Sequence, residues 1–375
     1  MINITNLLKV TIYIFIFLAS QFAKAADHPI ANISQSQNIE VAINKNIETL
    51  FIIYPLLDFG FPPVGNSLWE EATGYFHEYK DHEAVQKLAT LIRRTGIDGP
   101  VGLILHYHEL PRINIRYQPD ENTLMSFSET GDARDGQNVI NEFMEAFTDF
   151  YTKANVEAFM VKHEAYYHKA IDDVKRNLPP ADFIATLERY YGNQNKAYIL
   201  NPSPVLFPGF GFGKRIVTND GLVVFNTFGP FKTGRSNHSG FHYHFDNADK
   251  IRDLSVHEFG HSFINPITEI PENRVLIDQY AHLFEPLKEQ MGKQGYRNWW
   301  ICVTEHLVRL GEIRIALAMK DYKTAEKLRL NYTEQRHFIY LPHLEAKITE
   351  YENNRDKYRA FSDFFPILLE AFSEI

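Results

Sequence analysis

The chain has 375 residues, of which 45% are hydrophobic, and it carries a formal net charge of −9. This length and apolar content suffice for one large domain or two smaller ones with a substantial core, and they exclude extensive disorder. The acidic balance argues against nucleic acid or an anionic membrane surface as a partner. Because Cys302 is the only cysteine, no internal disulfide can form, and we interpret it as a small buried hydrophobic residue.

The N-terminus has the layout of a secretory signal peptide. Lys9 precedes the apolar run 10–19, and the small residues of Ala23-Lys24-Ala25 form a cleavage site after it. We therefore predict that residues 1–25 are removed near Ala25 and that the protein is exported to the periplasm or the extracellular space; an uncleaved anchor is the alternative. No later segment reaches the ~18 apolar residues of a transmembrane helix, so the mature chain is predicted to lack a membrane span.

The rest of the chain divides into three regions. Residues 26–48 are polar and rich in asparagine, which predicts an irregular leader. Residues 49–192 have a mostly helical pattern, with a candidate strand at 101–107 and a long helical stretch over about 137–178. Residues 193–375 read as a small sheet followed by helices. We expect the second and third regions to pack together as one α+β assembly that is mostly helical.

Strand signals gather at the start of the third region. Short apolar runs rich in β-branched residues occupy 197–200, 215–218 and 222–225. Asn219-Asp220-Gly221 separates the last two runs and is a hairpin signal. The glycine-rich stretch 208–213 lacks the spacing and the following helix of a phosphate loop, so we expect a mobile or tightly turning loop. These features predict a small mixed or antiparallel sheet.

Residues 257–261 read His-Glu-Phe-Gly-His, which matches the H-E-x-x-H pattern. Residues four apart share one face of a helix, so His257 and His261 can both direct a ring nitrogen at one metal ion. Glu258 lies beside that face, where it can accept a proton from a water that the metal activates. The pattern therefore predicts a metal site with an adjacent catalytic carboxylate.

The sequence around this motif favours a largely buried helix. Asp246 or Asn247 can cap its start, and residues 248–264 contain no proline. Apolar residues fall on more than one side of it. We expect Asn265-Pro266 to end the helix, because the residue before a proline is disfavoured in the α conformation.

A catalytic zinc site has three protein ligands and one open position, so a further ligand must come from elsewhere in the chain. Glu305 is the best candidate, because it stands in the otherwise apolar helical segment 299–309 and a buried carboxylate needs a cation. The alternative is an ion pair between Glu305 and Arg309 within that helix. Glu285 is the next candidate ligand, and Glu312 follows it.

The motif and the Glu305 segment carry a resemblance to a known group of enzymes. His257-Glu258-Phe259-Gly260-His261, followed by a distant Thr304-Glu305-His306-Leu307-Val308-Arg309, resembles the gluzincin zinc metallopeptidases. A closer resemblance is to a secreted, gluzincin-like bacterial family without an assigned role, and it extends from about Ile47 to the C-terminus. Its specific pieces include Tyr190-Tyr191-Gly192 and residues 262–266. The resemblance implies a zincin-like catalytic unit that binds Zn²⁺ through His257, His261 and Glu305, with residues 267–297 as an inserted helical excursion.

Such a site would hydrolyse a peptide bond with a metal-activated water. Glu258 would act as the general base and then deliver the proton to the leaving amine. The resemblance also implies a tyrosine or histidine, C-terminal to the ligand glutamate, that stabilises the developing oxyanion. The candidates for this role are Tyr340, His306 and His337.

Two residues are candidates for contacting the substrate. Asn226 lies in the strands ahead of the motif, which could bind a peptide by strand addition. His244 lies just before the motif helix, together with His242, and could reach the rim of the site.

The sequence thus predicts a secreted zinc metallopeptidase that acts on a peptide or protein substrate. One alternative is a catalytically inactive, metal-stabilised binding protein at a cell surface. Another is a zinc hydrolase of a non-peptide substrate. The presence of Glu258 argues against the inactive protein, because a structural metal site does not require a carboxylate there.

Overall fold

The computed structural model describes residues 39–57, 59, 68–112, 114–236 and 240–375, with only the backbone described at 232–236 and 240–243. The predicted signal peptide, residues 1–25, and the first part of the predicted leader lie outside this range. The structure is 64% helical and contains a small mixed sheet of four strands, which confirms the predicted α+β, mostly helical class. None of the described helices combines the length and apolar composition that crossing a membrane requires.

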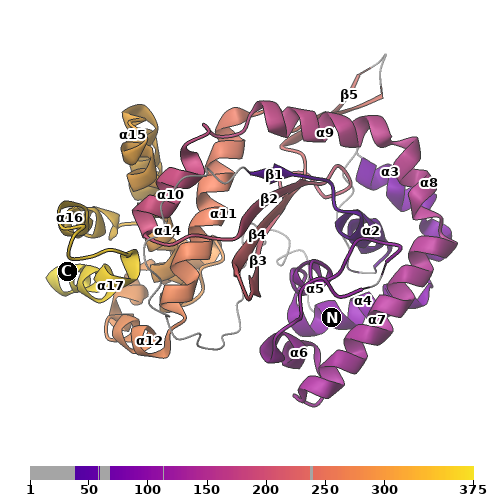
Figure 1. The fold of residues 1–375 in the computed structure, drawn as a ribbon, viewed down its shortest axis with the longest axis horizontal. Helices are drawn as coiled ribbons and strands as arrows, with labels where there is room; N and C mark the ends of the chain where they lie inside the picture. Colours follow the sequence, from indigo (N-terminus) through magenta and orange to yellow (C-terminus); the bar gives the residue numbers. More distant parts are fainter. Residues whose placement is uncertain (1–38, 58, 60–67, 113, 237–239) are drawn as a thin grey trace.

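Helices lie on both sides of the central sheet (Figure 1). Those that precede β2 in the chain are α2 (Lys45–Ile53), α3 (Leu68–Tyr75), α4 (Glu83–Thr95), α5 (Gly99–Ile104), α6 (Glu121–Phe127), α7 (Ala133–Lys153), α8 (Val156–Lys162), α9 (Glu164–Arg176) and α10 (Phe183–Tyr191). Those after it are α11 (Ala248–Thr268), α12 (Pro271–Asp278), α13 (Lys288–Lys293), α14 (Trp299–Ala318), α15 (Tyr322–Leu330), α16 (Leu341–Asn353) and α17 (Phe361–Leu369). In Figure 1, α2–α8 lie on one side of the sheet, and α11 and α14–α17 lie on the other.

The sheet has the strand order β1–β2–β4–β3, formed by β1 (Glu40–Val41), β2 (Ala197–Pro202), β3 (Gly211–Thr218) and β4 (Gly221–Phe228). β1, β2 and β4 are parallel, whereas β3 pairs antiparallel with β4 and forms one edge. The three predicted strands and the hairpin are confirmed. The glycine-rich stretch 208–213 differs from the expected loop because its second half belongs to β3. A separate antiparallel ribbon is made of β5 (Lys232–Ser236) and β6 (Gly240–His244).

The last ten residues of the predicted leader belong to the fold, so an irregular leader over 39–48 is wrong. Glu40–Val41 pairs in parallel with β2, and α2 starts at Lys45. The side-chain oxygen of Asn44 accepts a hydrogen bond from Ile47 N at 3.1 Å, and the buried Asn46 amide accepts one from Leu110 N at 2.9 Å. The asparagines that suggested irregular structure therefore cap a helix and satisfy buried backbone groups.

Two expectations for the N-terminal helices are wrong. Residues 99–104 form α5 rather than a strand, because Pro100 is preorganised for a first helical turn and a short apolar run fits either structure. Only Tyr107 keeps a strand-like bridge, to Ile115. The long helical stretch is divided into α7, α8 and α9, with the first break at Asn155, whose φ of 53° lies in the left-handed region.

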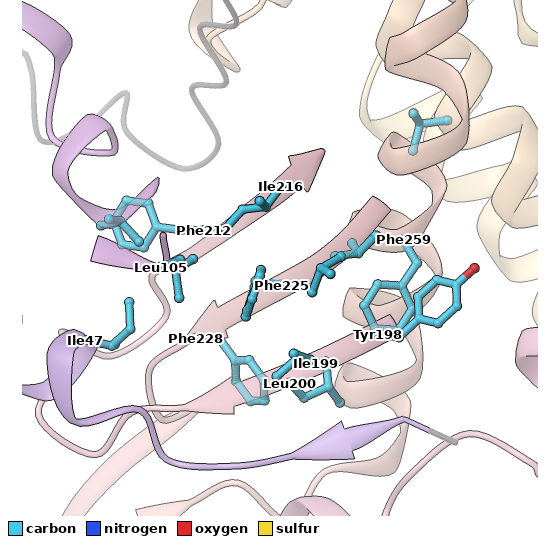
Figure 2. Packing of buried hydrophobic residues seen from close by; sticks show 14 of the residues in the cluster. Ile47, Leu105, Tyr198, Ile199, Leu200, Phe212, Ile216, Phe225, Phe228 and Phe259 are labelled. Atoms are coloured by element: carbon cyan, nitrogen blue, oxygen red, sulfur yellow. The ribbon is translucent and has the colours of Figure 1, made fainter. Parts of the chain in front are cut away.

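The motif helix α11 packs against both the sheet and α14. Its N-cap is Asn247, one of the two predicted candidates, with the side-chain oxygen accepting from Lys250 N at 2.9 Å. Phe259 of α11 packs on Tyr198 of β2, with ring centroids 4.9 Å apart (Figure 2). The predicted end at Asn265-Pro266 is wrong, because α11 continues through Pro266 to Thr268. The proline removes one backbone donor, but the turn survives through a bond from Glu269 N to Asn265 O of 2.9 Å.

Tyr191, at the end of α10, fixes the distance between α11 and α14. Its ring stacks on Phe263 of α11, with centroids 4.7 Å apart and planes 7° apart. Its hydroxyl lies so close to Gly311 of α14 that a Cβ there would be 2.0 Å from Tyr191 Oη. This close approach requires a residue without a side chain at position 311.

We expect Gly311→Ala to destabilise the fold by about 1–3 kcal/mol, because the added methyl group must displace a tyrosine held by a stacked phenylalanine. Urea unfolding followed by circular dichroism measures this change. Gly292→Ala in α13 is the matched control, since no atom lies within 4 Å of its added Cβ. That variant should be neutral or slightly more stable, by up to about 1 kcal/mol. Equal stability of the two variants would contradict the proposed packing.

Candidate metal centre

Two elements bring the predicted ligands together. His257 and His261 are buried one turn apart on α11, with ring centroids 4.7 Å apart. With Glu305 of α14 they offer three ligand atoms within 4.8 Å of one another, and this buried group could hold a metal ion. Glu285, the next candidate ligand, is instead an exposed residue 3.6 Å from Lys288. Of these two candidate ligands, Glu305 is therefore the one that the packing of α14 on α11 brings to the histidines.

The carboxylate of Glu305 lies between an imidazole and a guanidinium group. Its Oε1 is 3.4 Å from His261 Nε2, and its Oε2 is 3.7 Å from Arg309 Nη2. Burial alone would raise the pKa of Glu305, but the two histidines and Arg309 hold it well below its usual range. Oε2 has no hydrogen-bond partner among the described residues. The Glu305–Arg309 contact of the alternative interpretation exists, but it does not satisfy this carboxylate.

A hydrogen bond at Nδ1 orients each imidazole. His257 Nδ1 lies 3.0 Å from Glu312 Oε1, and His261 Nδ1 lies 3.0 Å from Asn265 Oδ1. Both oxygens are acceptors, so they favour the tautomer that carries its proton on Nδ1 and leaves Nε2 to donate an electron pair to a metal. Glu312, considered above as a possible ligand, thus holds the candidate ligand His257 instead.

Burial and neighbouring charges act differently on the two histidines. Burial lowers the pKa of His257 well below its ordinary value, which favours the neutral ring that binds metals. Burial acts on His261 in the same direction, but the adjacent Glu305 carboxylate outweighs it and raises the pKa of His261. A cation at this position would replace the proton between His261 and Glu305, since metal binding requires a deprotonated imidazole.

Glu312 is itself held by a buried network. Arg309 Nη1 donates to Glu312 Oε1 at 2.7 Å, and the Tyr332 hydroxyl donates to Oε2. The guanidinium of Arg309 also lies over the Tyr332 ring, 5.0 Å from its centroid. Each oxygen of Glu312 therefore has at least one donor, and its position relative to His257 is fixed from two directions.

Glu258 follows His257 on α11 and is almost fully buried. Neither of its carboxylate oxygens has a hydrogen-bond partner among the described residues. Burial raises its pKa to about 7, against the opposing influence of His261. A buried carboxyl group without donors is costly to a fold, so its presence beside three potential ligands requires an explanation.

The candidates for oxyanion stabilisation lie in other surroundings. The Tyr340 hydroxyl donates to the Leu283 carbonyl at 2.7 Å, within an aromatic cluster. His306 is fully buried, with Nδ1 2.8 Å from the Cys302 carbonyl, and its ring stacks on Tyr340. His337 is exposed, with a φ of 58°. The Tyr340 hydroxyl is thus already bonded, and neither Tyr340 nor His337 lines the small space at Glu258 and His261 or the pocket at His257.

The two substrate-side candidates are placed differently from each other. Asn226 is fully buried on β4, and neither its amide oxygen nor its nitrogen has a hydrogen-bond partner among the described residues. Val224, which shares a face of β4 with Asn226, lines the same small space as Glu258. His244 is partly exposed and lies 3.5 Å from Asp246. The side chain of His242 lies outside the described part of the chain.

Several residues of the site were not assigned their roles from the sequence. Asn265 was interpreted as a helix end, Glu312 as a weak ligand candidate, and Tyr332 had no role. Asn265 is four residues beyond His261, and this i, i+4 spacing is a signal that could have identified it. No comparable signal links Glu312 or Tyr332 to His257, because those contacts join separate helices.

Openings reach the group from two sides. On the sheet side, a small space is lined by Glu258, His261 and residues 213–215 of β3. It shares Lys214 and Arg215 with a cleft of about 360 Å³ between β3 and the α4–α6 helices. On the opposite side, a pocket of about 760 Å³ between α11, α14 and α15 reaches His257. The group is therefore buried but not sealed.

The fold and the site define a mostly helical α+β protein with a buried two-histidine, one-carboxylate group that could hold a metal ion. A family model described as a domain of unknown function, DUF4932, matches residues 66–371, so the chain belongs to that family. No curated protein and no solved structure matches it.

Proposed function

We propose that this chain is an exported, zinc-dependent metallopeptidase of the gluzincin type. The observation that supports this most strongly is the convergence of His257, His261 and Glu305 beside Glu258. A structural zinc site is usually closed by four protein ligands, whereas a catalytic one uses three and leaves a position open. Among the described residues three ligands converge, and the fourth nearby group is a carboxylate suited to proton transfer.

The chemistry of the donor set favours zinc. Two imidazole nitrogens and one carboxylate oxygen are a ligand set of catalytic zinc in peptidases. Magnesium and calcium prefer sites built from oxygen atoms alone. Oε2 of Glu305 has no hydrogen bond among the described residues, and an acceptor holds each Nδ1 atom, so the three side chains are prepared for such an ion.

The proposed reaction is hydrolysis of a peptide bond. Zinc held by the three ligands would supply Lewis acidity toward a water and the scissile carbonyl. Glu258 takes the proton of the attacking water and passes it to the leaving amine. Its pKa of about 7, raised by burial, suits both steps, because such a group accepts and releases a proton near neutral pH. Glu312 and Asn265 keep the two imidazoles aimed at the ion.

The edge strand β3 offers a binding surface for an extended peptide. It lies at the end of the sheet order and lines both the space at Glu258 and the adjoining cleft. A peptide added to this edge would bond to its backbone. Asn226, on the neighbouring strand, is fully buried, so this surface would bind a peptide through β3 rather than through the Asn226 amide. Lys214 and Arg215 carry charge at the cleft but are paired, with Asp98 at 2.6 Å and with Glu269, respectively.

Metal analysis combined with peptide cleavage tests this proposal. The purified protein is expected to contain zinc and to cut members of a random peptide library, to lose this activity with a zinc chelator, and to regain it with added zinc. Protein without bound metal would refute the site. Zinc bound without turnover of any peptide would favour the inactive binding protein or a hydrolase of another substrate. Expressed with its own N-terminus in a bacterium, the exported protein should begin at Ala26, as intact mass will show.

A further inference from the structure

The pocket on the α15 side of the site carries positive charge that the proposed mechanism does not use. It has a volume of about 760 Å³ and reaches the metal-ligand candidate His257, and its charged lining residues are Lys250, Asp253, Arg309, Glu312, Lys327 and Arg336. The two acidic residues are already paired. Arg309 Nη1 lies 2.7 Å from Glu312 Oε1, and Arg252 Nη2 lies 2.9 Å from Asp253 Oδ1.

The remaining three cations have no acidic partner within the part of the chain that the structure describes. Lys250 lies at the start of α11 and Lys327 in the last turn of α15, and both are exposed. Lys250 Nζ lies 5.4 Å from the centre of the Phe231 ring. Arg336 follows the π-helical turn Asn331–Gln335 and is half-buried. The three side chains come from different elements and line a single pocket.

Arg336 is fixed in position by neutral groups. Its Nε donates to Gln294 Oε1 at 2.9 Å, and its Nη2 donates to the Tyr296 hydroxyl at 3.0 Å. The guanidinium also lies 5.4 Å from the centre of the Phe338 ring. These contacts restrict the side chain without an ion pair to it among the described residues, although its charge also acts on the buried Glu312, so the group is preorganised for an anion.

This charge is not a property of the surface as a whole, since the chain has a formal net charge of −9. Two arginines nearby show the usual arrangement. Arg314 and Arg329 each bond to Glu345, at 3.1 Å and 2.7 Å. Three cations without an ion pair that line one pocket beside a candidate catalytic centre indicate a subsite for a negatively charged group.

We propose that this pocket binds a carboxylate of the peptide substrate, on the His257 side of the candidate metal centre and across it from β3. This inference rests on the proposed peptidase function. A guanidinium with free N–H donors recognises a carboxylate by charge-assisted hydrogen bonds, and the two lysines add to the attractive field. The methylene groups of the bound residue would contact the apolar part of the lining, which consists of Leu254, Leu328 and Leu330. The carboxylate belongs either to an aspartate or glutamate side chain or to the C-terminus of the substrate.

Binding of matched peptides tests the inference. The zinc-loaded Glu258→Gln protein, expected not to consume substrate, is titrated calorimetrically with acetylated, amidated hexapeptides that carry a single Glu or a single Gln at each position. A second series has a free C-terminal carboxylate. We expect one Glu position, or the free C-terminus, to bind about tenfold more tightly than its neutral counterpart. The series that shows the preference identifies the source of the carboxylate.

Substitutions in the pocket then assign the preference to it. Arg336→Gln and Lys327→Gln should each remove most of the preference for the acidic peptide while leaving the affinity for the neutral peptide within about twofold. Arg336 is half-buried, and its substitution can disturb folding. Lys327 is exposed, so Lys327→Gln should fold normally and keeps the test valid in that case. Lys323→Gln is the matched control, because it makes the same charge change on the same helix outside the pocket, and it should keep the full preference.

The outcomes separate this inference from the function on which it rests. If wild-type protein cleaves peptides but neither series shows a charge preference, the pocket is not a carboxylate subsite and the peptidase proposal stands. The same conclusion follows if both pocket variants keep the preference. If no peptide is bound or cleaved by zinc-loaded protein, both the subsite and the peptidase function are refuted.

Discussion

Glu258→Gln should reduce peptide cleavage by about 10²–10⁴-fold while leaving zinc bound. The substitution keeps the size of the side chain but removes its ability to accept a proton from water. Metal binding should persist, because Glu258 is not one of the three converging ligands. Steady-state cleavage of a peptide found in the library screen, together with zinc content by mass spectrometry, measures both effects on the same preparation.

The loss of activity must be distinguished from a loss of fold. An amide at position 258 replaces a buried carboxylate that has no hydrogen-bond donor among the described residues, so the metal-free variant should melt no earlier than wild type at pH 8. Glu285→Gln makes the same chemical change at an exposed residue and should cleave at the wild-type rate. Cleavage retained by Glu258→Gln would refute a mechanism in which this carboxylate moves the proton.

The core of the candidate site was predictable because its geometry is local. A helix places His257 and His261 on one face whatever the rest of the fold does, and Glu258 must then lie beside them. Predicting Glu305 as the third ligand required a further argument. A carboxylate in an otherwise apolar helix is expected to be buried, and a buried carboxylate needs a cation beside it. Its contact with His261, 3.4 Å between Oε1 and Nε2, agrees with that argument.

The parts that could not be predicted depend on contacts between helices. Glu312 and Glu305 are both buried acids on α14, and nothing in their composition tells which approaches the metal-binding nitrogens and which bonds to Nδ1 of His257. The way α14 packs against α11 decides this, and packing between helices that are distant in the sequence, such as the contacts of Tyr191 with Phe263 and Gly311, has no local sequence pattern. The error at Pro266 has a similar origin, since tertiary packing holds together a helical turn that proline alone disfavours.

A series of three Glu→Gln substitutions should rank the acidic residues that the sequence left open. Glu305→Gln should weaken zinc binding most, because the amide removes the anionic ligand and leaves the charge of the ion less compensated. Glu312→Gln should weaken it by about 10–100-fold, since it disturbs the acceptor that holds His257 rather than a ligand. Glu285→Gln should have no effect, because this carboxylate is exposed, pairs with Lys288 and is not part of the converging group. Competition with a chromophoric zinc chelator measures all three affinities.

Thermal unfolding with and without zinc supplies an independent measure that does not require enzymatic activity. An ion that binds only the folded state raises the melting temperature according to its affinity. The shift caused by zinc should therefore be full for wild type and Glu285→Gln, smaller for Glu312→Gln and smallest for Glu305→Gln. Glu312→Gln leaves Glu305, at 3.7 Å, as the carboxylate closest to Arg309 among the ion pairs of the described residues, so the melting temperatures without zinc show whether this variant has also weakened the fold. A full zinc shift in Glu305→Gln would mean that another group completes the site, and the assignment of α14 as the source of the third ligand would fail.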